Sequence, residues 1–241
     1  MQNRRHTGTR TGALVVALGL ALAACGGSSA VLRSASAGDP TTQGAVVFQG
    51  NFSDPSQQWP TSSDSTKSES TSGDTYTVQF NSGGSFDASP TISTVQPQDL
   101  VDVSVSVAAT PVNARSGDRF GVFCRGIQGH SYAFLVGPQS SGQLAWSIQL
   151  REPGGTRQLA SGTTAVPGVA PYGIRGDCVE GGPNHKPVVL ALYLGGNLVG
   201  QARDAKLPAP YVGRPGLNVS SAAGGTRVDF SNFQVRSATA P

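Results

Sequence analysis

The sequence predicts an all-β protein built as a two-sheet antiparallel sandwich. Short runs in which apolar and polar residues alternate recur along the chain, and such alternation is typical of half-buried strands. Turn signals rich in glycine separate the runs, and no apolar pattern is long enough for an amphipathic helix. Many short strands at regular spacing favour a sandwich or a barrel.

The clearest strand is Val101–Ala109, where four valines at every second position share one face. The run 187–194 (PVVLALYL) is apolar on both faces, which suits a central strand. Gly195–Asn197 supplies the positive φ angles of a tight hairpin turn after it. The run 61–74 lacks core-forming residues and is expected to be a polar loop. The remaining strands are expected at 45–49, 75–80, 119–126, 131–137, 143–150, 156–160, 172–181, 197–204, 212–221 and 226–236.

The N-terminus has the pattern of a secretory signal peptide. Arginines precede a short apolar run, Ala13–Ala24, and that run is too short for a permanent membrane helix. Leu22–Cys25 (LAAC) matches the bacterial lipobox, which predicts that Cys25 is acylated, with palmitate among the chains, and becomes the mature N-terminus. The expected organisation is a signal peptide over 1–24, a flexible tether over 25–44 and a sandwich domain over 45–237.

The charge balance argues against nucleic acid as a partner. The whole chain has a formal net charge of +3, and three arginines of the signal segment account for it. The mature protein is therefore expected to be neutral, with its Arg and Lys residues scattered singly. A nucleic-acid binder would instead show a basic stripe.

Five stretches in order give the chain a family resemblance. They are NFSDPSQQWP, FGVFCRGIQGHSYAFLVGP, IRGDCVEG, LYLGGNLVGQARD and VDFSNFQV. Together they resemble the concanavalin A-like lectin/glucanase jelly rolls, in the LamG-like form found in bacterial lipoproteins. The resemblance implies a jelly-roll fold and the pairing of Cys124 with Cys178, but it specifies no ligand. The chain departs from the pattern at Gly195, at Ser231 and in the insertion GGPNHKP.

The cysteine count also favours that disulfide. If Cys25 carries lipid, then Cys124 and Cys178 remain, and an exported protein lies in surroundings that permit disulfides. The alternatives are two free buried thiols, or a catalytic Cys124 working with His130. A bridged sulfur cannot act as a thiolate, so His130 is expected to be a solvated residue beyond a hairpin turn.

The sequence carries no signature of catalysis, and we expect no catalytic residue. Glucanases of the resembling fold carry a Glu-x-Asp-x-x-Glu strand, whereas Glu69, Glu152 and Glu180 each stand alone. Metal-binding spacings such as CxxC and HExxH are missing from the sequence, and so are phosphate-binding loops. Asp54 and Asp64 could contribute to a calcium site, but Asp54 is more simply the cap of its Asp-Pro turn. No cofactor is therefore expected.

Aromatic residues are the remaining candidates for ligand contact. Trp59, Tyr132 and Trp146 fit the apolar framework of the sandwich and are expected to pack in its core. Tyr172 and Tyr211 follow prolines in expected loops and are the predicted ligand-contacting residues.

These observations predict a lipid-anchored, lectin-like domain on the extracytoplasmic face of the cell membrane. It would bind a cell-envelope or environmental glycan, or a protein partner, without catalysis. A glycan-active hydrolase of the same fold is the alternative, and a structural envelope protein is the third possibility.

Overall fold

The chain folds as the two-sheet antiparallel sandwich that its alternating pattern predicts. A computed structural model describes residues 38–92, 95–180, 187–205 and 213–241. The strands are β1 (Thr42–Gln49), β2 (Ser62–Ser63), β3 (Lys67–Ser72), β4 (Thr75–Phe80), β5 (Gly84–Ala88), β6 (Val103–Val112), β7 (Arg119–Ile127), β8 (His130–Pro138), β9 (Leu144–Glu152), β10 (Gly155–Thr164), β11 (Tyr172–Glu180), β12 (Val188–Leu194), β13 (Asn197–Asp204), β14 (Arg214–Ser221) and β15 (Arg227–Thr239). Two short 3-10 helices, η1 (Pro55–Gln57) and η2 (Pro97–Leu100), lie between strands.

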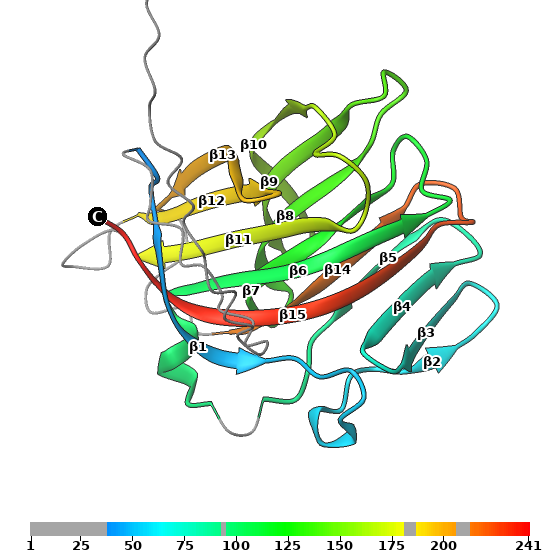
Figure 1. Cartoon of the computed structure of the whole chain (residues 1–241), viewed down its shortest axis with the longest axis horizontal. Helices are drawn as coiled ribbons and strands as arrows, with labels where there is room; N and C mark the ends of the chain where they lie inside the picture. Colours follow the sequence, from blue (N-terminus) through cyan, green and yellow to red (C-terminus); the bar gives the residue numbers. More distant parts are fainter. Residues whose placement is uncertain (1–37, 93–94, 181–186, 206–212) are drawn as a thin grey trace, which may run out of the picture. The chain divides into compact units, whose positions relative to one another are not determined.

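The strands form one nine-stranded and one six-stranded sheet. The nine-stranded sheet runs β13-β12-β11-β6-β15-β4-β3-β2, and β1 also pairs with β15. The six-stranded sheet runs β10-β9-β8-β7-β14-β5. In Figure 1 strands β11, β6 and β15 cross in front of β7, β8 and β14, so the two sheets stack as layers. No helix among the described residues is long and apolar enough to cross a membrane.

Strand β6 shows how the alternation builds the core. Val103, Val105, Val107 and Ala109 are buried and belong to one cluster that fills the space between the sheets. Val101 shares their parity in the sequence but precedes the strand and is only half-buried. Burial of one face in this way fixes the register, since a slip by one residue would expose every valine.

The expected polar loop at 61–74 is wrong, because residues 62–63 form β2 and residues 67–72 form β3. Strand β3 pairs with β4 from Lys67 opposite Phe80 to Ser72 opposite Thr75. Glu69, expected in a loop, lies inside β3 and is 3% exposed, with hydrogen bonds from Ser62 and Lys67. Backbone pairing at a sheet edge needs no apolar face, and polar side chains there discourage contact with other chains.

The hairpin between β12 and β13 confirms the expected tight turn. Gly195 and Gly196 have φ angles of +58° and +82°. Both angles lie in the left-handed region that a two-residue hairpin turn requires.

Three predicted core aromatics pack as expected. Trp59 is 6% exposed and Tyr132 is fully buried. Trp146 is partly buried and packs against the same core. A Cβ atom on Gly162 or Gly200 would come within 3 Å of its ring, so two strands approach the indole closely.

The predicted disulfide between Cys124 and Cys178 is confirmed. Cys124 lies in β7 and Cys178 in β11, so the bond joins the two sheets. Both residues are fully buried in the core. The alternatives of free thiols and of a catalytic Cys124 are therefore wrong for this structure.

A buried carboxylate, Asp118, connects the β6–β7 turn to the β14–β15 turn at the start of β7. Its Oδ2 accepts hydrogen bonds from the Arg115 backbone N–H (2.7 Å) and the Thr226 hydroxyl (2.6 Å), and Oδ1 accepts from the Ala222 N–H (2.9 Å). Burial alone would raise the pKa of Asp118, but these hydrogen bonds outweigh it and lower the pKa below its usual value.

We expect Asp118→Asn to lower the free energy of unfolding at neutral pH by roughly 1.5–3 kcal/mol, because hydrogen bonds to a charged acceptor are lost. The pKa of Asp118 is lower in the folded state than in the unfolded state. The extra free energy of unfolding of the wild type over the variant is therefore fully present above the unfolded pKa of about 4, and it is lost as the pH falls through the folded pKa. Urea unfolding from pH 7 to pH 2 measures it, with Asp74→Asn on an exposed turn as the control. A gap between wild type and variant that stayed constant down to pH 2 would contradict this account.

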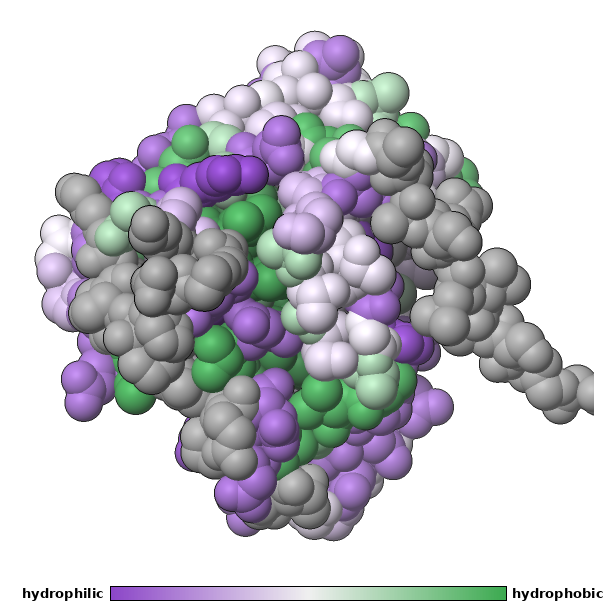
Figure 2. Space-filling view, turned by 90° about the vertical axis from the view of Figure 1, so that its left-hand side faces the viewer, coloured by the Kyte–Doolittle hydropathy of each residue, from purple (hydrophilic) through white to green (hydrophobic). Residues whose placement is uncertain are grey.

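The described surface has no single apolar face in the view of Figure 2, where hydrophobic residues reach the surface between hydrophilic ones. The exposed large hydrophobic residues lie on separate elements: Val46 in β1, Ile127 at the end of β7 and Val169 between β10 and β11. Scattered apolar residues of this kind are ordinary on a protein surface.

Candidate functional site

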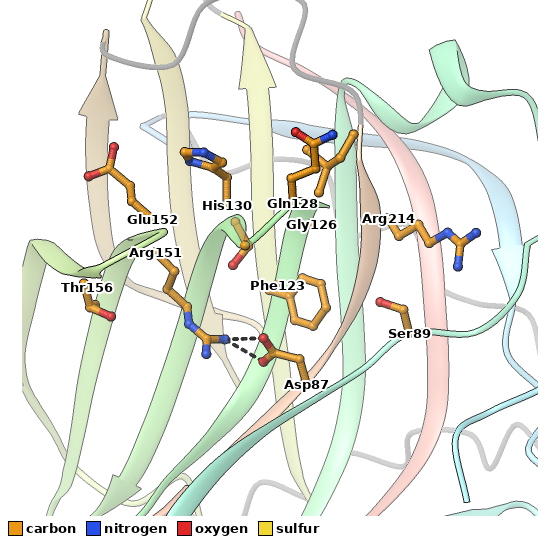
Figure 3. Close-up of a pocket in the computed structure, with 14 residues that line it drawn as sticks. Asp87, Ser89, Phe123, Gly126, Gln128, His130, Arg151, Glu152, Thr156 and Arg214 are labelled. Carbon is orange, nitrogen blue, oxygen red and sulfur yellow. Dashed lines mark hydrogen bonds and ion pairs between the residues drawn. The ribbon is translucent and has the colours of Figure 1, made fainter.

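A cleft of about 580 Å³ lies at one end of the six-stranded sheet. Its walls come from the β7–β8 hairpin, the β9–β10 hairpin, the end of β5 and the start of β14 (Figure 3). Antiparallel connections bring these six strand ends to the same edge of the sheet. The cleft therefore combines residues that are far apart in the sequence.

The cleft contains a hydrogen-bonded polar network around Asp87. Arg151 Nη1 contacts both carboxylate oxygens of Asp87, at 2.5 and 2.7 Å. The amide of Asn218 donates to Oδ1 of Asp87 at 2.6 Å, and Asn218 is 2% exposed. In Figure 3 Arg151 extends toward Asp87 with the Phe123 ring beside the pair. These contacts hold Asp87 and Arg151 in fixed positions, with part of each still exposed to solvent.

Phe123 supplies the apolar part of the cleft. Its neighbour Cys124 points into the core, so alternation turns Phe123 to the outer face of the sheet. There it forms a small apolar cluster with Ala133 and Leu135 that is separate from the main core. A Cβ atom on Gly216 would lie 2.5 Å from the Phe123 ring, so the absence of a side chain there makes room for the ring.

The rim of the cleft carries further polar residues. Gln128 and Gly129 form the turn of the β7–β8 hairpin, and His130 begins β8. His130 is half-buried and lines the cleft, so the expectation of a solvated hairpin residue was only partly correct. Arg214 at the start of β14 is exposed on the opposite side of the cleft.

The acidic residues of the cleft are not arranged like those of a glycosidase. Asp87 and Glu152 are the carboxylates among its lining residues. Figure 3 shows the Asp87 side chain directed at Arg151 and the Glu152 side chain extending away from it. Glycoside hydrolysis needs two carboxylates that face each other across the scissile bond, and this pair does not.

Of the two predicted ligand-contacting residues, the structure describes Tyr172, which does not line this cleft. Tyr172 is the first residue of β11 rather than a loop residue, and it packs against the core between the sheets. Tyr172 pairs with Ala109 of β6, so the strand begins where the alternation over 172–181 placed it, and the loop position expected for Tyr172 was wrong. Tyr211 and Cys25 lie outside the described residues.

The two aspartates considered for calcium are used in their own turns. Asp54 Oδ1 accepts the Ser56 N–H and caps η1, and Asp64 Oδ1 accepts from Thr66 and Lys67. These hydrogen bonds lower the pKa of both carboxyl groups. Within the described ranges, no group of three or more His, Cys, Asp or Glu side chains is placed to hold a metal ion.

The principal cleft residues were not among those predicted from the sequence. Phe123 could have been found, because its neighbour Cys124 was expected in the core and alternation then places Phe123 outside. Asp87 carried no such signal, since its strand β5 is short and mostly polar. Arg151 directly follows the expected strand 143–150, and nothing in the sequence indicated that it would pair with Asp87.

Comparison with solved structures supports the fold. A protein of unknown function with a galectin-like fold from Bacillus subtilis superposes with a TM-score of 0.54 at 11% identity, covering 83% of this chain and 100% of that chain. The carbohydrate-binding module CBM66 from Bacillus subtilis gives a TM-score of 0.43 at 14% identity, over 80% of this chain and 97% of that one. The GH43 BlXynB protein from Bacillus licheniformis gives 0.47 at 12% identity, over 68% of this chain and 33% of that one.

The sequence itself matches no family model and no curated protein. The galectin-like relative is similar in fold alone, because 11% identity carries no argument about function. The chain is thus an all-β, two-sheet antiparallel jelly-roll sandwich, similar in fold to the galectin-like protein.

Proposed function

We propose that this protein is a lipid-anchored, extracytoplasmic member of the LamG-like group of concanavalin A-like domains. It binds a glycan of the cell envelope or the environment without catalysis, in the cleft at the end of the six-stranded sheet. The anchor is inferred from the signal pattern and the lipobox cysteine, Cys25. Two or more acyl chains hold a soluble domain stably on a membrane.

The observation that carries the binding proposal is the Phe123 ring beside the Asp87–Arg151–Asn218 network. Phe123 is 4% exposed and lines the cleft, so its ring gives an apolar floor that a sugar would touch at the ring's exposed edge rather than a face on which the sugar would stack. Planar charged groups held in fixed positions donate to and accept from the hydroxyl groups of the sugar. A concave site with an apolar floor and a few convergent polar groups is the usual design of a small-ligand site.

We expect Arg151→Ala and Phe123→Ala to weaken binding at least about tenfold to any glycan that the wild-type protein retains on a glycan array. Each variant removes one of the two recognition elements. Arg227→Ala is the matched control, because Arg227 forms a comparable ion pair with Asp229 on the other sheet. Fluorescence titration with the retained oligosaccharide measures the affinity.

Two results would contradict the binding proposal. The first is equal affinity in wild type and both cleft variants, which would place binding elsewhere. The second is release of sugar from the same glycan, abolished by Asp87→Asn or Glu152→Gln, which would make the protein a hydrolase.

The anchor is tested separately. We expect the wild-type precursor, expressed in a bacterium with lipoprotein processing, to incorporate labelled palmitate and to partition into detergent. Cys25→Ala is expected to remove both properties, because the acylated residue is lost. Labelling that persists in Cys25→Ala would refute this assignment.

A further inference from the structure

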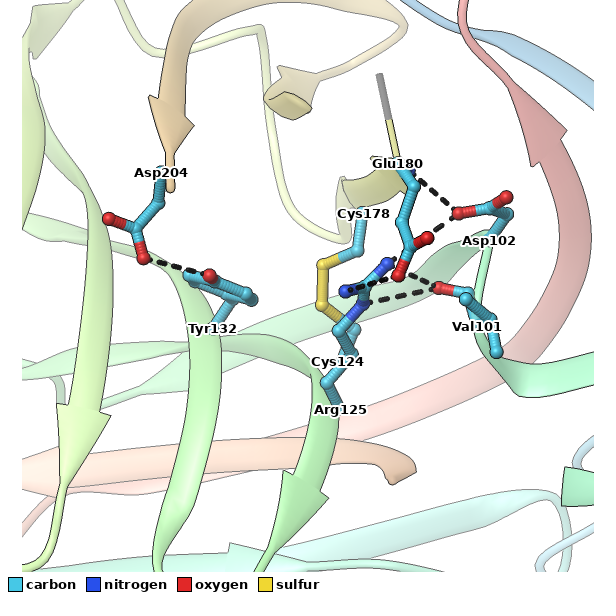
Figure 4. Close-up of polar contacts among 8 residues, drawn as sticks. All are labelled: Val101, Asp102, Cys124, Arg125, Tyr132, Cys178, Glu180 and Asp204. Carbon is cyan, nitrogen blue, oxygen red and sulfur yellow. Dashed lines mark hydrogen bonds and ion pairs between the residues drawn. A yellow bond between two sulfur atoms is a disulfide. The ribbon is translucent and has the colours of Figure 1, made fainter. Parts of the chain in front are cut away.

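Arg125 departs from the alternation of β7. Phe123 faces the cleft and Cys124 faces the core, so Arg125 would be expected beside Phe123 in the cleft. Instead its backbone is left-handed, with φ at +55°, and the β7–β8 register shifts between Cys124 and Ile127. The irregularity turns the side chain toward the other sheet, where only 1% of it is exposed (Figure 4).

The guanidinium of Arg125 is tied to the end of the nine-stranded sheet. Its Nε and Nη2 donate to the Val101 carbonyl, at 3.2 and 3.0 Å. Nη1 lies 3.4 Å from Glu180 Oε1 and Nη2 lies 3.5 Å from Asp102 Oδ1. Asp102 also accepts the Glu180 backbone N–H at 2.7 Å, which joins the two acidic residues. A planar group with several donors suits such a site better than an ammonium would.

The residues that directly follow Arg125 build one wall of the cleft. Gly126 to Ser131 all line it. Within this wall Gln128 is also left-handed, with φ at +49°. A Cβ atom on Gly126 would lie 2.5 Å from the Phe123 ring and 2.9 Å from the Arg214 carbonyl, so the wall is closely packed. Two non-glycine residues with positive φ in one hairpin persist only where the surroundings hold them, and such strain gathers at functional sites.

We propose that Arg125 is a positioning residue for the cleft: from the opposite sheet, it holds the β7–β8 hairpin in the conformation that forms the binding wall. The inference rests on the proposed function, because it takes the cleft as the binding site. A wall ordered before the ligand arrives avoids the entropy cost of ordering it during binding. Substitution of Arg125 removes its hydrogen bonds to the Val101 carbonyl and its ion pairs with Glu180 and Asp102 from a position that is 1% exposed, so the contact should be sensitive to substitution.

Amide hydrogen exchange of the full chain tests this role without a ligand. In Arg125→Gly we expect the amides of residues 126–131 to exchange about tenfold faster or more. Glycine accepts the positive φ at this position and the neighbouring disulfide remains, which favours retention of the fold. The β12–β13 hairpin serves as the internal reference and is expected to stay within about twofold of wild type.

Two matched variants separate the effect of the Arg125 contacts from that of backbone strain. Gln128→Gly relieves the second positive φ and leaves the Arg125 contacts in place, so amide exchange at residues 126–131 should remain as in wild type. Arg125→Lys keeps the charge and is expected to restore part of the protection. Unchanged exchange at 126–131 in Arg125→Gly would overturn the proposal, and so would an equal rise in both hairpins, which marks a purely structural role. The exchange experiment uses no ligand. If the protein bound no glycan on an array, the exchange result would therefore still hold, and only the proposed function would be contradicted.

Discussion

Replacing both Cys124 and Cys178 with alanine is expected to lower the free energy of unfolding by about 4 kcal/mol. The two residues are 54 positions apart, and in the chain-entropy model a cross-link of that span restricts the unfolded chain by roughly this amount. The bond also joins the two sheets at a fully buried position, so its loss removes packing on both sides. Urea unfolding followed by circular dichroism measures the change.

The reduced wild-type protein is the matched control for this experiment. Reductant should lower the stability of the wild type to near that of the double variant and should leave the variant itself unaffected. The double variant is preferred to a single substitution, because replacing only one cysteine would leave a free thiol in the core. If oxidised wild type and the double variant unfolded at the same urea concentration, the bond would not form in the protein.

The fold could be predicted from sequence where side-chain patterns carry it. The valines of β6 alternate, and Gly195 with Gly196 marks a turn, so both elements were expected where the structure has them. Strands β3 and β5 could not be predicted in the same way. They are short and mostly polar, and their stability comes from backbone pairing with β4 and β14 rather than from an apolar face.

The candidate site was less predictable, because it depends on pairing across the sheet. Asp87 lies opposite Asn218 in the β14–β5 pairing, and Arg151 contacts it from the end of β9. Arg125 shows a second limit. Alternation alone would place it in the cleft, but a backbone irregularity after Cys124 sends it to the other sheet. Exceptions of this kind to local rules are expected where structure serves a site.

Trp59→Ala is expected to lower the free energy of unfolding by about 3–5 kcal/mol, the usual cost of truncating a buried tryptophan. Trp59 lies in a cluster of four aromatic rings, with centroids 4.7 Å from Phe52, 5.3 Å from Tyr76 and 5.1 Å from Phe233. These rings come from the segment after β1, from β4 and from β15, so the indole connects the N-terminal segment to the nine-stranded sheet. Removing it leaves a cavity that rings fixed on three elements cannot close.

Trp59→Phe is the control that separates packing from the polar contact of the indole. It keeps an aromatic ring and loses only the long hydrogen bond from Nε1 to Gln57 Oε1, at 3.4 Å, together with part of the buried area. The expected loss in free energy of unfolding is therefore smaller for Trp59→Phe than for Trp59→Ala. Changes that conserve side-chain volume in a core cost less than about 1.5 kcal/mol, and Trp59→Phe reduces the volume far less than Trp59→Ala does. The chain has two tryptophans, so the fluorescence of Trp146 reports unfolding in both variants. Equal and small losses in the two variants would show that the cluster does not hold the N-terminal segment to the sheet, and the role of Trp59 as a core residue would then be wrong.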